Sequence, residues 1–289
     1  MNPLKDQFMW YTAQRKPSVG ILSWFLPTFL VLIAVACASV PHTGRRQFNV
    51  VSDKQLNALG LKVFDEVVMK EPQSKNERVN ASVKKVTDNV IKAAERIDRP
   101  GFDWKVAIIE DDTPNAFCLP GGKIVVCTGL LPHAKNEAGL AAIIAHEIAH
   151  AVSKHGAERL SQKLALEGAL NIGGQVLRGE DGSIGTGTKL LLSALGMGGT
   201  VGIILPYSRT HEFEADRIGQ IYMAAAGYDP EESVRLWDRM SKIKKPPIPI
   251  WLSTHPADAD RINKLKEFLP DAMKYYRDAA TKYGVGGSL

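Results

Sequence analysis

The spacing of apolar residues divides the chain into a helical part, a short stranded part and a second helical part. Apolar positions recur at helical spacing over 53–70 and 77–96, which predicts two amphipathic helices. Residues 104–110 alternate instead and are rich in β-branched side chains, and 123–127 form a second predicted strand after a Pro-Gly-Gly turn. We therefore expect an α+β fold that is mostly helical, with a small antiparallel β-sheet.

An apolar helix is predicted directly after the second strand. Asn136 is a suitable N-cap, Glu137 falls in the first turn, and the residues up to Lys154 are rich in good helix formers. A helix this apolar is expected to be buried. The histidines and the second glutamate within it are costly there unless a partner satisfies them.

These polar residues have the spacing of a metal site. His146 and His150 are four residues apart, so they lie on one helix face, one turn apart, and both rings can reach one metal ion. Glu147 follows the first histidine directly and can take a proton from a metal-bound water, then pass it to the leaving amine. The alternative is a core helix whose polar residues are hydrogen-bonded.

A catalytic zinc site needs a third protein ligand and an open position for water. The best downstream candidate is the stretch 209–217, at the start of a helix predicted to run from near Ser208 to Ala226. Glu212 and Asp216 share one face of it, so Glu212 can bind the metal while Asp216 accepts a hydrogen bond from a ligand histidine. On spacing alone His211 and Glu214 remain rival ligands, and the segment could also be an exposed charged helix.

These motifs together resemble a known family. A His-Glu-x-x-His motif followed downstream by Ser-Arg-x-x-Glu-x-x-Ala-Asp is similar to the integral-membrane and envelope zinc metallopeptidases that include the CAAX-prenyl protease, HtpX and the periplasmic BepA-type proteases. The matching residues are Ser208, Arg209, Glu212, Ala215 and Asp216. Further matching segments are 41–47, 115–130 and 252–256, the last followed by Arg261 and Ile262.

The resemblance implies a zincin-like zinc metalloendopeptidase with one Zn²⁺ per chain, held by His146, His150 and Glu212. Asp216 and Arg209 would support these ligands from outside the coordination sphere. The implied substrates are misfolded or misassembled envelope proteins, cleaved in quality control. A membrane-attached, chaperone-like assembly factor with a structural or regulatory zinc is the alternative. A prenyl-protein processing enzyme fits poorly, because that branch has several membrane spans.

Two residues are candidates for stabilising the oxyanion at the scissile carbonyl, His255 and Tyr207. Other roles stay open for His255: it could be a fourth zinc ligand that holds the resting enzyme inactive, or a surface histidine that caps the next helix. We expect the strand at Gly122, Lys123, Ile124 and Val125 to be an edge strand that receives the substrate as an added β-strand. An ordinary interior strand is the alternative.

The N-terminus has the pattern of an export or anchor segment. Arg15 and Lys16 precede the uncharged, apolar stretch 19–40, and small residues lead into Cys37. We expect residues 1–37 to be a lipoprotein signal peptide that ends at Cys37; a retained transmembrane anchor and cleavage without lipid are alternatives. The expected location is a bacterial cell envelope, membrane-attached and facing the periplasm.

The rest of the chain divides into a peptidase domain, 38–270, and the end of a C-terminal helix with its tail, 271–289, of which we expect 284–289 to be frayed. Glycines interrupt apolar runs over 157–205. Within this segment we expect 179–188 to be a loop and 190–205 to be a helix packed over the catalytic helices, with a mobile lid or a membrane-dipping segment as the alternative. Cys118 and Cys127 are too far apart along the predicted hairpin to bridge, so we expect two buried thiols. With 36 basic and 31 acidic residues the net charge is +5, too mild to indicate nucleic-acid binding.

Overall fold

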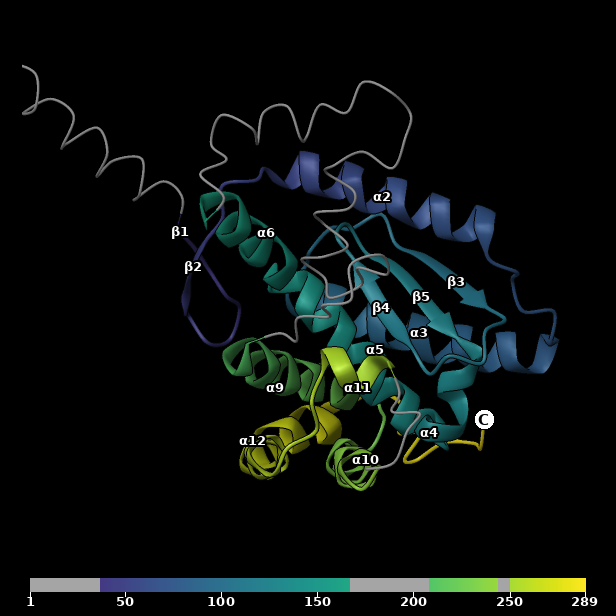
Figure 1. Cartoon of the computed structure of the whole chain (residues 1–289). Helices are drawn as coiled ribbons and strands as arrows, with labels where there is room; N and C mark the ends of the chain where they lie inside the picture. Colours follow the sequence, from purple (N-terminus) through teal and green to yellow (C-terminus); the bar gives the residue numbers. More distant parts are fainter. Residues whose placement is uncertain (1–36, 167–207, 244–249) are drawn as a thin grey trace, which may run out of the picture. The chain divides into compact units, whose positions relative to one another are not determined.

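The computed structural model describes residues 37–166, 208–243 and 250–289 (Figure 1). Residues 38–289 form one compact unit. The N-terminal apolar stretch up to residue 36, most of the glycine-rich segment and Tyr207 lie outside the described residues. Within the described ranges, no helix is both long and apolar enough to cross a membrane.

Two long helices precede the sheet, as the apolar spacing predicts. Helix α2 spans Asp53–Lys70 and helix α3 spans Glu77–Ile97. Each begins at a side-chain cap: Ser52 accepts a hydrogen bond in α2, and Asn76 does so in α3. A two-stranded hairpin lies before them, formed by β1 (Cys37–Ser39) and β2 (Arg46–Phe48).

The three-stranded sheet has the order β3-β5-β4. Strands β4 (Ala116–Leu119) and β5 (Lys123–Cys127) form the predicted antiparallel hairpin, whereas β3 (Lys105–Ile109) pairs with β5 in parallel. The sheet is therefore mixed rather than wholly antiparallel. Because β5 is hydrogen-bonded on both sides, the expectation that it is the substrate-binding edge strand is wrong: Gly122, Lys123, Ile124 and Val125 belong to an interior strand or its turn.

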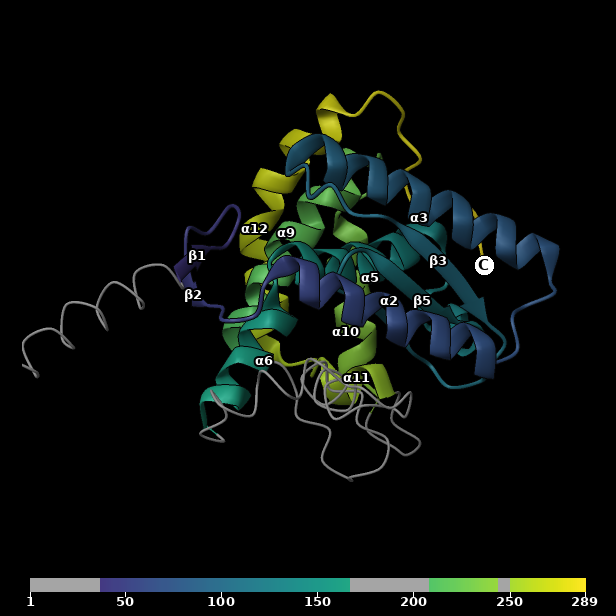
Figure 2. The ribbon, with the colours of Figure 1, turned by 90° about the horizontal axis from the view of Figure 1, so that it is seen from above.

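Helices cover both faces of this sheet, as Figure 2 shows from above. Alternation along β5 directs Val125 and Cys127 toward a cluster with α2 and α6 (His155–Leu166). Ile124 and Val126 point to the other side, into the larger core with α3 and α5 (Glu137–Val152). The catalytic helix predicted from the sequence is therefore held between the sheet and the second helical part.

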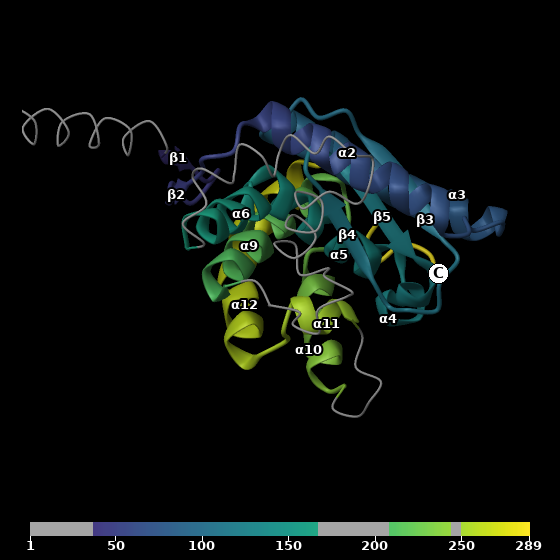
Figure 3. The ribbon, with the colours of Figure 1, turned by 45° about the horizontal axis from the view of Figure 1, so that its top comes forward.

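The second helical part packs on the opposite side of α5 (Figure 3). Its elements are α9 (Arg209–Ala225), α10 (Glu231–Ser241), α11 (Ile250–Thr254) and α12 (Ala259–Asp278). Before α5, the chain passes through a short 3₁₀ helix, η1 (Thr128–Leu130), and α4 (Leu131–Ala134). Helix α9 packs against both α5 and α12, and side chains from the three helices can therefore meet.

The C-terminal tail is ordered, and the prediction of a frayed end is wrong. The amide of Glu137 donates to the carbonyl of Gly287 at 2.9 Å, and the amide of Ala138 donates to Val285 at 3.0 Å. The first amides of a helix have no partner within it, so the tail supplies acceptors that α5 otherwise lacks.

Candidate metal centre

Helix α5 places its polar residues deep in the protein. Asn136 caps the helix by accepting a hydrogen bond from the Gly139 amide at 2.8 Å, as predicted. His146, Glu147 and His150 are buried, each with 4% or less of its surface exposed. Burial of three such groups on one apolar helix requires partners, which the neighbouring helices supply.

Helix α9 brings the third predicted ligand to these histidines. It begins at Ser208, whose hydroxyl accepts a hydrogen bond from the His211 amide. Glu212 and Asp216 are both buried and face α5. The side chains of His211 and Glu214 are buried but do not join the metal donors. His211 contacts Glu158, and Glu214 contacts His155.

Four donor atoms converge, because His255 joins the three predicted ligands. His146 Nε2 lies 3.1 Å from His150 Nε2 and 3.2 Å from His255 Nδ1. The oxygens of the Glu212 carboxylate lie 3.4 Å from His146, 3.3 Å from His150 and 3.0 Å from His255.

These separations fit a zinc ion. A tetrahedral ion with bonds of about 2.0 Å has ligand atoms about 3.3 Å apart, and zinc binds histidine nitrogen and carboxylate oxygen with that geometry. Burial lowers the pKa of His150 well below its usual value, so this ring is neutral and offers a lone pair. The donor set thus fits the zinc cofactor: His146, His150 and Glu212 would hold it, and His255 Nδ1 lies where a fourth ligand would bind.

Carboxylate and guanidinium groups support the ligands. His146 Nδ1 lies 3.0 Å from Asp216 Oδ1, as the sequence spacing predicts. Arg261, from α12, pairs with both oxygens of Asp216 at 2.8 and 2.6 Å and with Glu212 at 2.6 Å, and its guanidinium lies over the Trp237 ring. Burial would raise the pKa of Glu212 and Asp216, but Arg261 and the histidines hold both pKa values below their usual range.

Glu147 is oriented by α11. Its Oε1 accepts a hydrogen bond from Trp251 Nε1 at 2.7 Å and lies 3.4 Å from His255 Nε2. The Trp251 indole stacks on Trp237, with ring centroids 4.8 Å apart. The carboxylate that the sequence assigns as the proton carrier is thus fixed beside the donor set without joining it.

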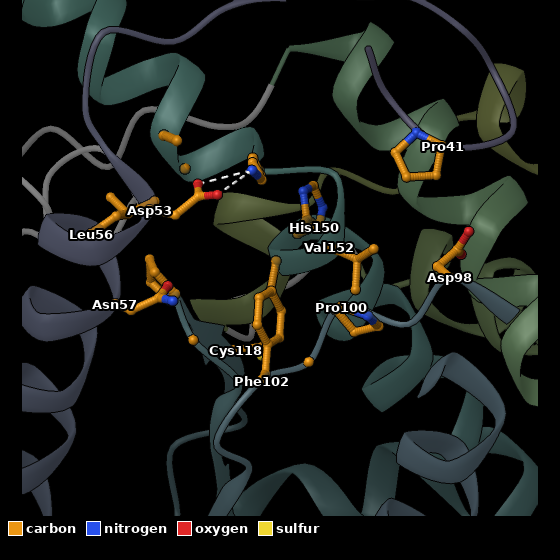
Figure 4. A pocket seen from close by; sticks show the side chains of 17 residues that line it. Pro41, Asp53, Leu56, Asn57, Asp98, Pro100, Phe102, Cys118, His150 and Val152 are labelled. Atoms are coloured by element: carbon orange, nitrogen blue, oxygen red, sulfur yellow. Dashed lines mark hydrogen bonds and ion pairs between the residues drawn. The ribbon is translucent and has the colours of Figure 1, made fainter. Parts of the chain in front are cut away.

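A cavity of about 290 Å³ lies beside the site, between α2, the end of β4 and the C-terminal end of α5 (Figure 4). His150, Phe102 and Val152 line it, and an ion pair between Lys154 and Asp53 lies at its border. Such a space next to a metal ligand can hold a side chain of a bound peptide.

Cys118 lines the same cavity, and both Cys118 and Cys127 are buried free thiols, as expected. Burial raises the pKa of the Cys118 thiol well above its usual value and that of Cys127 to about 12. Both thiols therefore stay protonated in this environment.

Some predicted site residues are not at the site. Arg209 is exposed and pairs with Asp260 at 2.6 Å, so the prediction that it supports the ligands is wrong: its side chain points to solvent and to α12. Tyr207 lies outside the described residues. The side chains that do support the ligands and Glu147 are Arg261 and Trp251, which residue spacing alone does not reveal. Arg261 falls within a segment that resembles the family, which was the available signal.

Comparison with known proteins gives a consistent result. The model of peptidase family M48 matches residues 77–269. The mitochondrial metalloendopeptidase OMA1 of Schizosaccharomyces pombe is 34% identical over 247 residues, which cover 81% of this chain and 67% of that protein. The mitochondrial metalloendopeptidase OMA1 of Homo sapiens is 29% identical over 88% of this chain and 50% of its own length.

A more distant relative is the beta-barrel assembly-enhancing protease of Yersinia pestis, 29% identical over 54% of this chain and 32% of its own length. The chain thus spans about half or less of several relatives that it matches. The expected location, a bacterial envelope facing the periplasm, is contradicted, because the relatives that match most of the chain are named as mitochondrial proteins.

Proposed function

Because the chain belongs to peptidase family M48 and is a zinc metalloendopeptidase, we propose that it cleaves misfolded or misassembled proteins as a quality-control protease. The observation that carries the proposal is Glu147, a buried carboxylate fixed beside the metal donors in the position a general base requires. The name of the Yersinia pestis relative, a beta-barrel assembly-enhancing protease, supports a role connected with protein assembly.

The residues divide the chemistry between them. Zinc, when bound, polarises the scissile carbonyl and lowers the pKa of a water molecule. Glu147 takes a proton from the attacking water and passes it to the leaving amine. Trp251 donates to Oε1 of Glu147, which leaves Oε2 to carry that proton. Asp216 and Arg261 keep the ligands in place while this proton moves.

His255 has a regulatory part in this proposal. Its Nδ1 lies among the metal donors, 3.2 Å from His146 Nε2 and 3.0 Å from Glu212 Oε1. These are the separations expected between two ligand atoms of one ion. A catalytic zinc site keeps one position open for water, and His255 Nδ1 would fill that position if it stayed where it lies here. We therefore favour the alternative in which His255 is a fourth ligand in the resting enzyme and moves aside when substrate binds.

The substrate is proposed to bind along β4. Asn115 accepts a hydrogen bond from Cys127, and Leu119 accepts one from Gly122, so alternate residues of β4 face β5. The main-chain groups of Ala116 and Cys118 then point away from β5. Strand β4 is the outer strand on this side among the described strands, and it packs against α5. Pairing through the main chain suits a protease that accepts many unfolded sequences.

Membrane attachment through the N-terminal segment is a further part of the proposal. Its support is the basic pair Arg15 and Lys16 before the apolar stretch 19–40. Carbonate extraction of membranes tests it: the full chain should stay with the lipid, whereas a variant lacking residues 1–37 should be released. Release of the full chain would reject the attachment.

Digestion of one protein in its folded and unfolded forms tests the proposed function. The zinc-loaded enzyme should cleave the unfolded form and spare the folded one, and Glu147→Gln should cleave neither. Equal cleavage of both forms would reject quality control as the function. If Glu147→Gln prevents aggregation of the unfolded protein as well as the unaltered chain does, and neither cleaves it, the chaperone-like assembly factor is the correct function.

A further inference from the structure

The two histidines of α5 are supported in different ways. His146 contacts a carboxylate directly, Asp216, which is held by Arg261. His150 contacts another imidazole: its Nδ1 lies 2.8 Å from Nδ1 of His155, the first residue of α6. The function proposed above makes no use of His155, although its side chain is fully buried.

His155 continues to a second carboxylate and a second arginine. Its Nε2 lies 3.1 Å from Oε2 of Glu214. Glu214 accepts hydrogen bonds from Arg45 Nε at 2.9 Å and from the Thr43 hydroxyl at 2.7 Å. The chain of contacts therefore runs from His150 through His155 and Glu214 to Arg45, and it parallels the shorter chain behind His146.

The position of each proton along this series of side-chain contacts follows from the geometry. His150 directs Nε2 at the other metal donors, so its lone pair is there and its proton is on Nδ1. His155 Nδ1 must then accept that proton's hydrogen bond. The remaining proton of His155 is on Nε2 and is donated to Glu214.

Arg45, the last residue in this series of contacts, comes from the N-terminal hairpin. Arg45 precedes β2 and also pairs with Glu158 of α6 at 2.7 Å. The same hairpin reaches the end of α5, where Gln47 donates to the carbonyl of Ser153 at 2.7 Å. The hairpin follows the N-terminal segment directly in the sequence. Arg45 therefore links the part of the chain just after that segment to the metal ligand His150.

We infer that His155 is a positioning residue for the metal ligand His150, and that Arg45 of the N-terminal hairpin holds it in place through Glu214. We call these contacts, from His150 through His155 and Glu214 to Arg45, the relay. The relay fixes the tautomer and the ring orientation of His150, as carboxylates do for other metal-binding histidines. The inference rests on the metal site and is independent of which proteins the enzyme cleaves.

Zinc affinity of the full chain, measured by competition with a chromophoric chelator, tests the inference. His155→Phe keeps the ring shape and removes both hydrogen bonds, so zinc should bind about 10- to 100-fold more weakly. His211→Phe is the matched control, because His211 is also buried and stacks on His155 with ring centroids 4.4 Å apart, but contacts Glu158. It should hold zinc as tightly as the unaltered chain.

A second readout separates positioning from simple packing. The visible absorption of the Co²⁺-substituted protein should shift in His155→Phe and stay unchanged in His211→Phe, because only the first alters a ligand. Equal weakening of zinc binding by both variants would overturn the inference.

Two milder variants test the outer members of the relay. Glu214→Gln and Arg45→Met should each weaken zinc binding, and Glu214→Gln combined with His155→Phe should weaken it little more than His155→Phe alone. Fully additive effects would mean that the residues act separately, and the relay would be rejected. Unchanged zinc affinity in Arg45→Met would remove the hairpin from it.

Discussion

Gly219 of α9 lies directly against the main chain of His146 on α5. A Cβ atom at Gly219 would stand 2.9 Å from the His146 amide nitrogen and 3.0 Å from its Cα, closer than side chains tolerate. Glycine at this point lets the two helices approach, and the approach brings Glu212 to the histidines. The metal site therefore depends on a residue that has no polar side chain.

Gly219→Ala should force α9 away from α5 and separate Glu212 from His146 and His150. Overpacking of this kind costs about 1–3 kcal/mol in the free energy of unfolding, and zinc should bind more weakly. Gly287→Ala is the control, since the nearest atom to its Cβ is at 3.7 Å. Chemical denaturation and a zinc competition assay check both, and unchanged zinc affinity in Gly219→Ala would show that the helix contact does not set the site.

His255→Ala should raise the rate at which short unstructured peptides are cleaved. Removal of the imidazole leaves the fourth coordination position to water, because His255 Nδ1 now lies among the donors. Steady-state kinetics on a fluorogenic peptide measures the effect. A lower kcat with an unchanged KM would instead assign His255 to stabilisation of the oxyanion, and the resting-ligand role would be abandoned.

Arg261→Met should be strongly destabilising. It leaves Asp216 and Glu212 buried without their cationic partner, which costs about 3–5 kcal/mol. Arg209→Met offers a direct comparison, because Arg209 is exposed and its effect should stay within about 0.5 kcal/mol. Thermal unfolding of the two variants checks the difference, and similar stability losses would refute the assignment of Arg261 to the site.

Glu158 should stabilise the protein above a pH of about 4.5 and lose this effect on acidification. Burial alone would raise its pKa, but hydrogen bonds from His211 and Arg45 lower it to about 2. A depressed carboxyl pKa contributes stability above the pKa of the unfolded state, and the contribution declines as pH falls toward the folded value.

Unfolding of the unaltered chain and Glu158→Gln between pH 7 and 3 measures this. The stability difference should be constant down to about pH 5 and shrink below it. A difference that grows on acidification would contradict the ion pair. Glu267→Gln, at an exposed pair with Lys264, should show little effect at any of these pH values.

The histidine pair could be recognised in the sequence because local spacing determines which face of a helix its members share, whereas Glu212 is selected over His211 and Glu214 by the family resemblance. His146 and His150 are one turn apart on α5, and Glu212 and Asp216 are one turn apart on α9. The cap at Asn136 is local for the same reason. Helix α2 has the predicted boundaries, and α3 runs one residue further.

Contacts between distant segments could not be predicted in this way. Arg261 and Trp251 reach the site from helices far along the chain, and no spacing rule relates them to α5. The interior position of β5 depends on the order in which strands pair, which alternation does not encode. The C-terminal tail is similar: its polar, glycine-rich sequence indicates a frayed end, yet α5 needs its carbonyls.

The central claim is that Glu147 carries protons while Glu212 holds the metal. Zinc content per chain and peptide turnover, measured together in Glu147→Gln and Glu212→Gln, test it most directly. Glu147→Gln should retain about one zinc per chain and lose turnover by about 100- to 10,000-fold, whereas Glu212→Gln should lose zinc and turnover together. A fully zinc-loaded Glu212→Gln, or a Glu147→Gln that cleaves peptide at the unaltered rate, would contradict it.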